Sequence, residues 1–264
     1  MILDDILART RADLPARQAA RPLAEVETVV RDLPPARDLW GALRQPGRVT
    51  AIAEFKRRSP SAGWIREGAA VGEVVTGYVG GGAAALSVLT DEPFFGGTLE
   101  DLRRARAAVS VPLLRKDFVV DEYQIAEARA AGADAVLLIV AALDPPTLRL
   151  LFAACARWGV QALVETHDAV EVARAVELGA RIIGVNHRDL CTFTMDRELA
   201  IRLRAQIPAD RVLVAESGIR DAADVQRMGA HRIDAVLVGE TLMRAPHPGA
   251  ALANLLSSAQ TTGS

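Results

Sequence analysis

A carboxylate and an ammonium lie two positions apart at Glu54 and Lys56. Residues 49–55 are predicted to form a strand, and strand side chains alternate between two faces, so both groups point to the same side. Such a pair can bind an anion and move a proton. The segment 59–63 combines two serines, a proline and a glycine, which is typical of a loop that holds an anion. A solvated ion pair followed by an ordinary turn is the alternative.

The lysine content singles out two positions. The chain has 31 Lys and Arg residues, of which only Lys56 and Lys116 are lysines. An ammonium can lose its proton and have its pKa tuned by burial, whereas a guanidinium stays charged. We therefore predict a chemical role for both lysines, each at an expected strand end. Chance retention in an arginine-rich composition is the alternative.

Short apolar runs alternate with amphipathic segments of helical periodicity from about residue 49 onwards. Eight strands alternating with helices are typical of a closed (β/α)8 TIM barrel. An open doubly wound sheet is the alternative, but its first turn usually carries a G-x-G-x-x-G loop, which the turn after Phe55 lacks. The expected strands are 49–55, 84–90, 111–116, 135–140, 161–165, 182–186, 212–216 and 235–239.

Residues 1–45 are predicted to form a helical extension packed on the barrel, which occupies residues 46–264, in a single domain overall. Apolar residues recur at helical spacing from Ile2 to Leu14. Four prolines are expected to break this helical pattern: Pro15, Pro22, Pro34 and Pro35.

A weak internal repeat supports a closed barrel. The dipeptide Gly-Ala follows a helical segment and precedes an even-numbered strand at 82–83, 132–133, 179–180 and 229–230. Each glycine can adopt the left-handed conformation that ends a helix. The even spacing favours a repeating unit of two strands.

Charged residues end the odd-numbered strands, whereas the even-numbered strands end mostly in apolar or small residues, apart from Asn186. Alternate strands of a barrel contribute one layer of inward side chains, so these charges should converge at the carboxyl-terminal mouth. Buried charges must be paired or functional. A purely structural charge network is the alternative. The charged residues are Glu54, Lys56, Lys116, Glu165 and Glu216.

The composition excludes several classes of protein. With 50% hydrophobic and 24% charged residues, the chain suits one folded domain and not a disordered one. A net charge of −2 and 4% aromatic residues argue against nucleic acid or a membrane as partner. The acidic N-terminus predicts no secretory signal. Cys155 and Cys191 have no CxxC spacing, so we expect reduced thiols, no metal, no cofactor and a cytoplasmic location.

Seven motifs follow one another along the chain: IAEFKRRSPS (52–61), LSVLT (86–90), LRKDF (114–118), LVETH (163–167), IGVNHRDL (183–190), AESGI (215–219) and LVGE (237–240). Together they strongly resemble the indole-3-glycerol-phosphate synthase family of tryptophan biosynthesis. The resemblance extends from about residue 2 to residue 256. It implies a carboxy-lyase that acts on a small phosphorylated substrate, and we expect a monomer or weak homo-oligomer.

The resemblance implies that 1-(2-carboxyphenylamino)-1-deoxyribulose 5-phosphate closes its ring and loses carbon dioxide and water, giving indole-3-glycerol phosphate. Lys116 is assigned as the general acid for ring closure. Glu165 is then the expected proton partner in the later step. Lys56 is expected to bind the substrate carboxylate and to supply a proton, with Glu54 tuning it. Three further catalytic positions of the family are matched by Asn186, Glu216 and Ser217.

The substrate phosphate is expected at the barrel mouth, after the seventh and eighth strands. There Gly218, Gly239 and Glu240 offer backbone N–H groups at helix starts. Ser59 and Arg188 match the family's other phosphate contacts. Apolar residues expected to enclose the aromatic ring are Phe94, Phe95, Phe118 and Leu190.

One position departs from the family pattern. The family often has Asn-Asn-Arg after the sixth strand, whereas this chain has Asn186, His187 and Arg188. Alternation along the strand turns His187 away from the reacting centre, so we expect a packing or supporting role.

Two other functions fit the same residues. A Schiff-base aldolase would use Lys116 or Lys56 as a nucleophile. A sensor on the same barrel would bind the sugar phosphate without turnover. The feature taken to favour the synthase is the combination of two lysines with odd-strand glutamates and no metal ligands.

Overall fold

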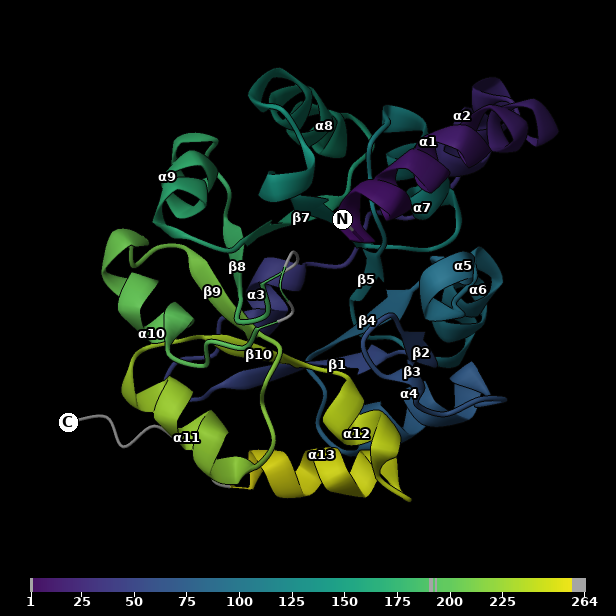
Figure 1. Ribbon diagram of the computed structural model, residues 1–264. Coiled ribbons are helices and arrows are strands. Elements are labelled where there is room, and N and C mark those ends of the chain that lie inside the picture. The colour runs from purple at the N-terminus through teal and green to yellow at the C-terminus, as the bar shows by residue number, and fades with distance from the viewer. Residues whose placement is uncertain (1, 190–191, 193, 258–264) are drawn as a thin grey trace.

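The computed structural model describes residues 2–189, 192 and 194–257. Eight parallel strands form a closed barrel, in the order β1-β10-β9-β8-β7-β6-β5-β4, surrounded by helices (Figure 1). The predicted (β/α)8 barrel is confirmed, and the open doubly wound sheet is wrong. The barrel strands are β1 Thr50–Phe55, β4 Ala85–Leu89, β5 Leu113–Lys116, β6 Ala135–Ile139, β7 Gln161–Thr166, β8 Ile182–Asn186, β9 Val212–Glu216 and β10 Ala235–Val238.

The barrel strands are buried on both faces, which explains why they appear in the sequence as continuous apolar runs. One face packs against the outer helices and the other fills the lumen. Ile52 belongs to the lumen cluster and is in register with Leu237 of β10 and Ala85 of β4. The lumen is therefore a packed core that supports the charged strand ends.

Aspartate and threonine side chains cap several outer helices. Asp144, Asp168 and Asp221 each accept a hydrogen bond from a backbone N–H in the first turn of the helix that follows. Within the described ranges, no helix is long and apolar enough to cross a membrane. The outer helices are α4 Val71–Gly80, α5 Glu92–Phe95, α6 Leu99–Ala108, α7 Glu122–Ala130, α8 Pro145–Arg157, α9 Ala169–Glu177, α10 Leu199–Leu203, α11 Ala222–Ala230, α12 Glu240–Arg244 and α13 Pro248–Leu256, with short 3-10 helices η1 Val140–Ala142 and η2 Arg204–Gln206.

Three of the four Gly-Ala dipeptides end a helix as predicted. Gly82, Gly132 and Gly179 have φ angles of +95°, +95° and +84°, in the left-handed region. The prediction is wrong at Gly229, which lies inside α11. There the chain takes its left-handed turn at Arg232, with φ of +58°.

The N-terminal segment is helical and packs along α7, as Figure 1 shows. The prediction that Pro15 breaks the helix is wrong, because α1 continues through it. A proline inside a helix removes one backbone hydrogen bond. Contacts with the barrel hold α1 in place, including an ion pair between Arg17 and Glu127 of α7. The three helices are α1 Ile2–Ala20, α2 Leu23–Arg31 and α3 Leu39–Leu43.

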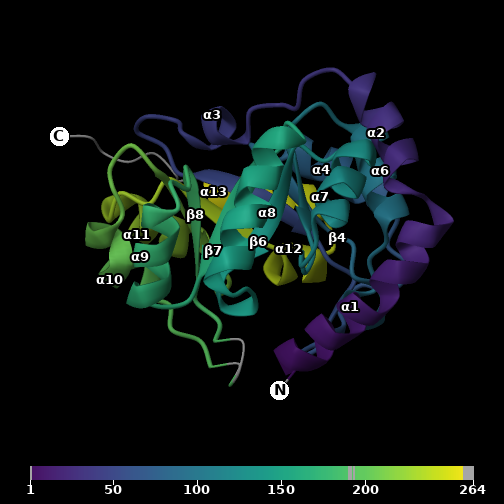
Figure 2. The same ribbon diagram turned by 90° about the horizontal axis from the view of Figure 1, so that it is seen from above.

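Helix α3 covers one end of the barrel, and the start of α1 lies at the other end (Figure 2). Leu39 and Leu43 are buried and join the lumen cluster. The Trp40 ring is contacted by the guanidinium groups of Arg44 and Arg181, whose carbons lie 5.0 and 4.2 Å from the ring centroid. This end of the barrel is thus closed by packing, and the polar strand ends lie at the opposite end.

Candidate active site

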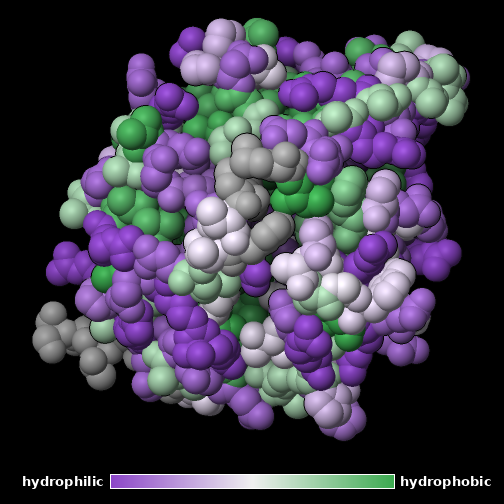
Figure 3. All heavy atoms as spheres, viewed as in Figure 1, coloured by the Kyte–Doolittle hydropathy of each residue, from purple (hydrophilic) through white to green (hydrophobic). Residues whose placement is uncertain are grey.

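A cavity of about 400 Å³ opens at the carboxyl ends of the barrel strands. Its wall includes Ile2 of α1 as well as strand and loop residues. The space-filling view of this face shows apolar surface beside the start of α1, among hydrophilic residues (Figure 3). Thirteen of the predicted site residues line this cavity: Glu54, Lys56, Ser59, Lys116, Phe118, Glu165, Asn186, Arg188, Glu216, Ser217, Gly218, Gly239 and Glu240.

The remaining expectations concern the wall around the substrate ring. Phe95 lines the cavity and its ring centroid lies 6.1 Å from that of Phe118. Phe94 does not line the cavity, so its expected contact with the ring is not supported. Leu190 lies outside the described residues.

The register of the sheet brings the polar strand ends to one level. Glu54 of β1 is paired with Ser87 of β4, and Glu216 of β9 is paired with Asn186 of β8. Since inward side chains of a barrel form layers, residues at one level meet in the lumen. The structure therefore brings together charges that are separated by more than a hundred residues in the sequence.

Lys56 and Glu54 form an ion pair at the edge of the cavity. The distance from Lys56 Nζ to Glu54 Oε1 is 2.9 Å. The hydroxyl of Ser87 lies 3.4 Å from the other oxygen of Glu54. The Lys56 side chain is 18% exposed and that of Glu54 is 5% exposed. The carboxylate thus holds the lysine while the ammonium remains accessible to an anionic ligand.

The segment after Lys56 is more ordered than the predicted loop. Its ends form a short antiparallel hairpin of β2 Arg58–Ser59 and β3 Gly63–Trp64. The Ser59 hydroxyl accepts a hydrogen bond from the N–H of Ala62 at 3.2 Å. From the other side of the mouth, Arg188 donates to the Ser61 hydroxyl at 3.3 Å. Hydroxyls and a guanidinium therefore converge where an anionic group can bind.

Lys116 lies between two buried glutamates. Its Nζ is 3.1 Å from Glu165 Oε2 and 3.6 Å from Glu216 Oε2. Burial opposes the charge on Lys116, but the nearby carboxylates outweigh burial and raise its pKa well above the usual value. Burial likewise works against the charge on Glu165, yet Lys116 holds the pKa of this carboxyl well below its usual range. Lys116 is therefore an ammonium and Glu165 a carboxylate.

Glu216 differs from Glu165 although the two are neighbours. Burial, and then the charge of Glu165, raise the pKa of Glu216 to about 8. Among the described residues, neither of its carboxyl oxygens has a hydrogen-bond partner. The site at neutral pH therefore contains one ionised and one protonated carboxyl group around Lys116. A protonated carboxyl can donate a proton or a hydrogen bond to a ligand.

Two glycines make room for the carboxyl groups. A Cβ atom at Gly184 of β8 would collide with Glu216 Oε1, and one at Gly239 would collide with the carboxyl of Glu54. Both glycines belong to or follow even-numbered strands, which lie between the charged ones. The small residues at these strand ends are thus part of the site.

Asn186 links Glu165 to the loop after β9. Its Nδ2 donates to Glu165 Oε1 at 3.3 Å, and its Oδ1 accepts from the hydroxyl of Ser217 at 2.8 Å. Ser217 has a φ angle of +67°, which is unusual for a residue other than glycine. His187 contacts the backbone oxygen of Ser217 through Nδ1 at 3.0 Å. The turn after β9 is thereby fixed from the end of β8.

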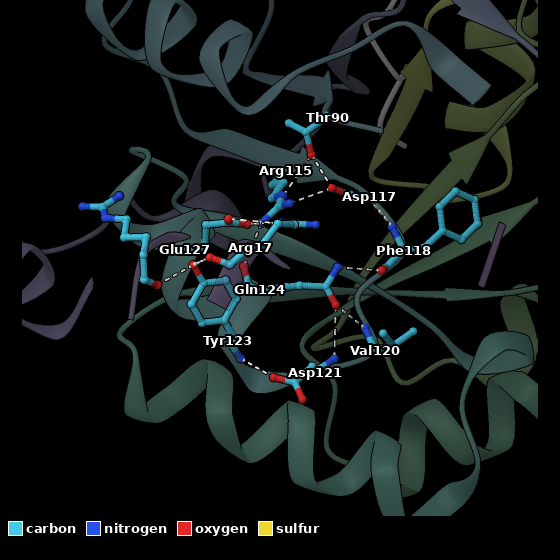
Figure 4. A network of polar contacts seen from close by, with 11 residues as sticks. Arg17, Thr90, Arg115, Asp117, Phe118, Val120, Asp121, Tyr123, Gln124 and Glu127 are labelled. Carbon is cyan, nitrogen blue, oxygen red and sulfur yellow. Dashed lines mark hydrogen bonds and ion pairs between the residues drawn. The ribbon is translucent and has the colours of Figure 1, made fainter. Parts of the chain in front are cut away.

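The end of β5 is held by a buried network behind Lys116 (Figure 4). Arg115 is 1% exposed and donates to Asp117 at 2.7 Å, to Thr90 at 2.9 Å and to Glu127 at 2.9 Å. Asp117 in turn accepts the backbone N–H of Phe118 at 2.8 Å. Because Glu127 also binds Arg17 of α1, the network connects the N-terminal helix to the loop that follows Lys116.

The whole chain resembles known proteins. A family model described as indole-3-glycerol phosphate synthase matches residues 3–255. Indole-3-glycerol phosphate synthase 2 of Streptomyces coelicolor is 51% identical over 255 residues, which cover 97% of this chain and 98% of the relative. The chain belongs to the indole-3-glycerol phosphate synthase family. The resemblance inferred from seven motifs is thus confirmed.

Further comparisons agree with this family and with its fold. Indole-3-glycerol phosphate synthase of Rhodopirellula baltica is 49% identical over 257 residues, covering 97% of this chain and 99% of the relative. The solved structure of thiamine phosphate pyrophosphorylase from Pyrococcus furiosus superposes with a TM-score of 0.62. It covers 84% of this chain and 98% of its own at 15% identity, so it supports the barrel fold alone.

Three residues in or beside this cavity were not predicted from the sequence. Arg115 and His167 lie within motifs that carry the family resemblance, but their side chains act from behind the cavity wall. Gly184 also lies within a motif, IGVNHRDL (183–190), but in the sequence it is only a small residue of an even-numbered strand. Gly184 is in register with Val214 of β9, and its closeness to Glu216, two residues further along that strand, appears only in the folded barrel.

We expect His187→Asn to leave kcat of the synthase reaction within about threefold of the original. His187 is 1% exposed and does not line the cavity, and burial lowers its pKa, so it is neutral near pH 7. The cost should appear as a loss of about 1 kcal/mol in the free energy of unfolding. A kcat/KM profile that loses an ionisation between about pH 6 and 7 would place His187 in the catalytic set.

Proposed function

We infer that this cavity converts 1-(2-carboxyphenylamino)-1-deoxyribulose 5-phosphate into indole-3-glycerol phosphate, carbon dioxide and water. This is the reaction of the family to which the chain belongs, and it is a step of tryptophan biosynthesis. The observation that supports this site is Lys116 between Glu165 and Glu216 at the mouth of the barrel. That arrangement offers an ammonium, a carboxylate and a protonated carboxyl within one ligand's reach.

Ring closure joins the aromatic carbon that bears the carboxylate to the ketone carbon. The electron pair of the C=O bond moves to oxygen, and Lys116 gives this oxygen a proton. An alkoxide is a stronger base than an amine, so the transfer is favourable even though the carboxylates raise the pKa of Lys116. The bond to the carboxylate then breaks, its electron pair returns to the ring, and carbon dioxide leaves.

Dehydration requires one proton to be delivered and another to be removed. The new hydroxyl leaves as water after it gains a proton, and the methylene beside the nitrogen loses one to form the indole double bond. We assign removal of the methylene proton to the ionised Glu165. Lys56 binds the substrate carboxylate first and later protonates the hydroxyl, while Glu54 holds its ammonium 2.9 Å away.

The phosphate of the substrate is assigned to the side of the mouth formed by Ser59, Arg188, Gly218 and Gly239. Backbone N–H groups after β9 and β10 and the guanidinium of Arg188 suit a dianion. The aromatic ring then lies toward Phe118, next to the lysines. This orientation places the ketone between Lys116 and Lys56.

Arg188→Ala should lower kcat/KM by about 10- to 100-fold, the equivalent of one or two charge-assisted hydrogen bonds. Substrate without its phosphate should react poorly even at saturation, because remote binding energy holds the ring over the ketone. Exposed Arg174 on α9 provides the control, and Arg174→Ala should match the original enzyme. Equal reaction of the two substrates would show that no phosphate site exists here.

The function is tested by adding the carboxyphenylamino substrate to the purified protein and following indole fluorescence. Product must appear in proportion to enzyme. The absence of product would rule out the assignment and is the result expected of a sensor. Borohydride added with substrate should not trap a covalent adduct. Trapping on Lys116 or Lys56 would instead favour the Schiff-base aldolase.

We also propose that the protein acts in the cytoplasm as a monomer or weak homo-oligomer, without nucleic acid or membrane as partner. The net charge of −2 and the small aromatic content support the part of this proposal that concerns nucleic acid and membranes. The substrate is a small phosphorylated molecule. Sedimentation at several protein concentrations gives the oligomeric state directly.

A further inference from the structure

A histidine that none of the steps above uses lies directly behind Glu165. The imidazole of His167 is placed between two carboxylates. Its Nδ1 is hydrogen-bonded to Glu171 Oε2 at 3.1 Å, whereas its Nε2 lies 3.3 Å from Glu165 Oε1 as an ion-pair contact without hydrogen-bond geometry. The side chain of His167 is 13% exposed, and that of Glu165 is 1% exposed. With Lys116 on the other oxygen of Glu165, four groups of alternating charge extend from the cavity to the start of α9.

Glu165 has several charged and polar neighbours from different strands. Lys116 of β5 attracts its negative charge, and the carboxyl group of Glu216 of β9, protonated at neutral pH, lies 3.6 Å from the same ammonium. Asn186 of β8 donates a weak hydrogen bond to Oε1 at 3.3 Å. Across the lumen, Glu54 of β1 interacts electrostatically with Lys116 and Glu216. His167 is thus the second cation in contact with Glu165 among the residues that the structure describes.

We propose that His167 is a positioning residue, which as an imidazolium held by Glu171 keeps Glu165 ionised and turns its Oε2 toward Lys116. The proposal rests on the role of Glu165 in the proposed function. Burial opposes the charge on His167, but Glu165 and Glu171 outweigh burial and raise its pKa to about 10. His167 is therefore charged throughout the neutral range.

The catalytic cycle explains why Glu165 needs a second cation. When Lys116 gives its proton to the substrate oxygen, it becomes neutral and Glu165 loses its main counter-charge. A buried carboxylate without a cation tends to take up a proton. The imidazolium of His167 remains charged during this step because Glu171 lies on its far side. Glu165 thus remains a base for the methylene proton.

A role confined to the start of α9 is the competing interpretation. The Glu171 side chain accepts the backbone N–H of His167 at 2.7 Å, and Asp168 caps the helix by accepting the N–H of Glu171 at 2.8 Å. If His167 only helped to start α9, its replacement would lower stability and leave the titration of Glu165 unchanged. The two interpretations therefore differ in a measurable pKa.

The decisive measurement is a carbon-13 NMR titration of the Glu165 carboxyl in protein labelled at glutamate, with Glu165→Gln identifying the signal. We expect His167→Gln to raise the pKa of Glu165 by about one to three units, the usual effect of losing an adjacent opposite charge. Glu171→Gln should raise it less, because the amide oxygen still accepts the His167 N–H. Asp168→Ala is the control: it should destabilise α9 without changing the pKa of Glu165.

Turnover gives an independent second readout. In His167→Gln the acidic limb of the kcat profile should move to higher pH by the same amount as the carboxyl titration, with KM nearly unchanged. An unchanged Glu165 titration in both His167→Gln and Glu171→Gln would overturn the proposal. If His167→Gln does not fold, the nitrogen-15 chemical shifts of His167 in the unaltered protein test the proposal instead. A neutral imidazole at pH 7 would also overturn the proposal. A shifted titration with unchanged turnover would instead remove Glu165 from the proposed function.

Discussion

Lys116→Arg should lower kcat by about two to four orders of magnitude, the usual effect of removing a general acid. Arginine keeps the positive charge that Glu165 and Glu216 surround, so the site should remain assembled. A guanidinium is nevertheless too weak an acid to protonate the substrate oxygen, and its planar fork does not occupy the position of a compact ammonium. Single-turnover measurement of indole fluorescence reports the ring-closing and later steps together.

The unfolding midpoint of Lys116→Arg serves as the control for this experiment. It should remain close to that of the original protein, because no buried carboxylate loses its cation. A second control replaces an arginine by lysine on the surface. Arg104 on α6 is 67% exposed, and Arg104→Lys should leave kcat unchanged. Turnover near the original level in Lys116→Arg would remove Lys116 from the mechanism.

Arg115→Met should lower the free energy of unfolding by about 3–5 kcal/mol, the effect of removing one partner from a buried ion pair. The guanidinium is 1% exposed and lies between the carboxylates of Asp117 and Glu127. Methionine fills similar space but leaves both carboxylates without this cation. Urea unfolding, followed by circular dichroism, measures the change.

Two variants separate charge from packing in this experiment. Arg104→Met, on the surface, should change stability by no more than about 0.5 kcal/mol. Adding Asp117→Asn to Arg115→Met should recover part of the loss, because the amide carries no charge to desolvate. If Arg115→Met is as stable as the original protein, the network in Figure 4 does not hold the end of β5.

Much of the fold could be predicted because two features that indicate it, the apolar runs of the strands and the alternation of side chains along them, are local in the sequence. The strands were apolar runs with ends correct to within two residues, since parallel strands are buried on both faces. Strand alternation indicated which charged residues meet at the mouth, and Lys56 and Lys116 were conspicuous among the arginines. None of these features depends on which residues contact each other across the barrel.

The missed features depend on contacts between distant segments. Helix α1 continues through Pro15 while it packs on the barrel, with contacts such as that between Arg17 and Glu127, which are 110 positions apart in the sequence. Gly229 does not end α11, since the helix continues to Ala230 and the left-handed residue is Arg232, although glycine is locally the better residue for that conformation. His167 carried no periodic signal, and its position behind Glu165 follows from the turn into α9. Local sequence patterns contain none of this information.

The close approach of Gly184 to Glu216, and of Gly239 to Glu54, also constrains how the sequence can diverge. Each pair belongs to neighbouring strands, so one member's side chain occupies the space that the other member leaves empty. Neither glycine can acquire a methyl group while its partner remains a glutamate in this rotamer. An alanine at either position therefore requires the partner glutamate to change its rotamer or to be replaced, so the residue tolerated at each glycine position depends on where the neighbouring carboxyl group points.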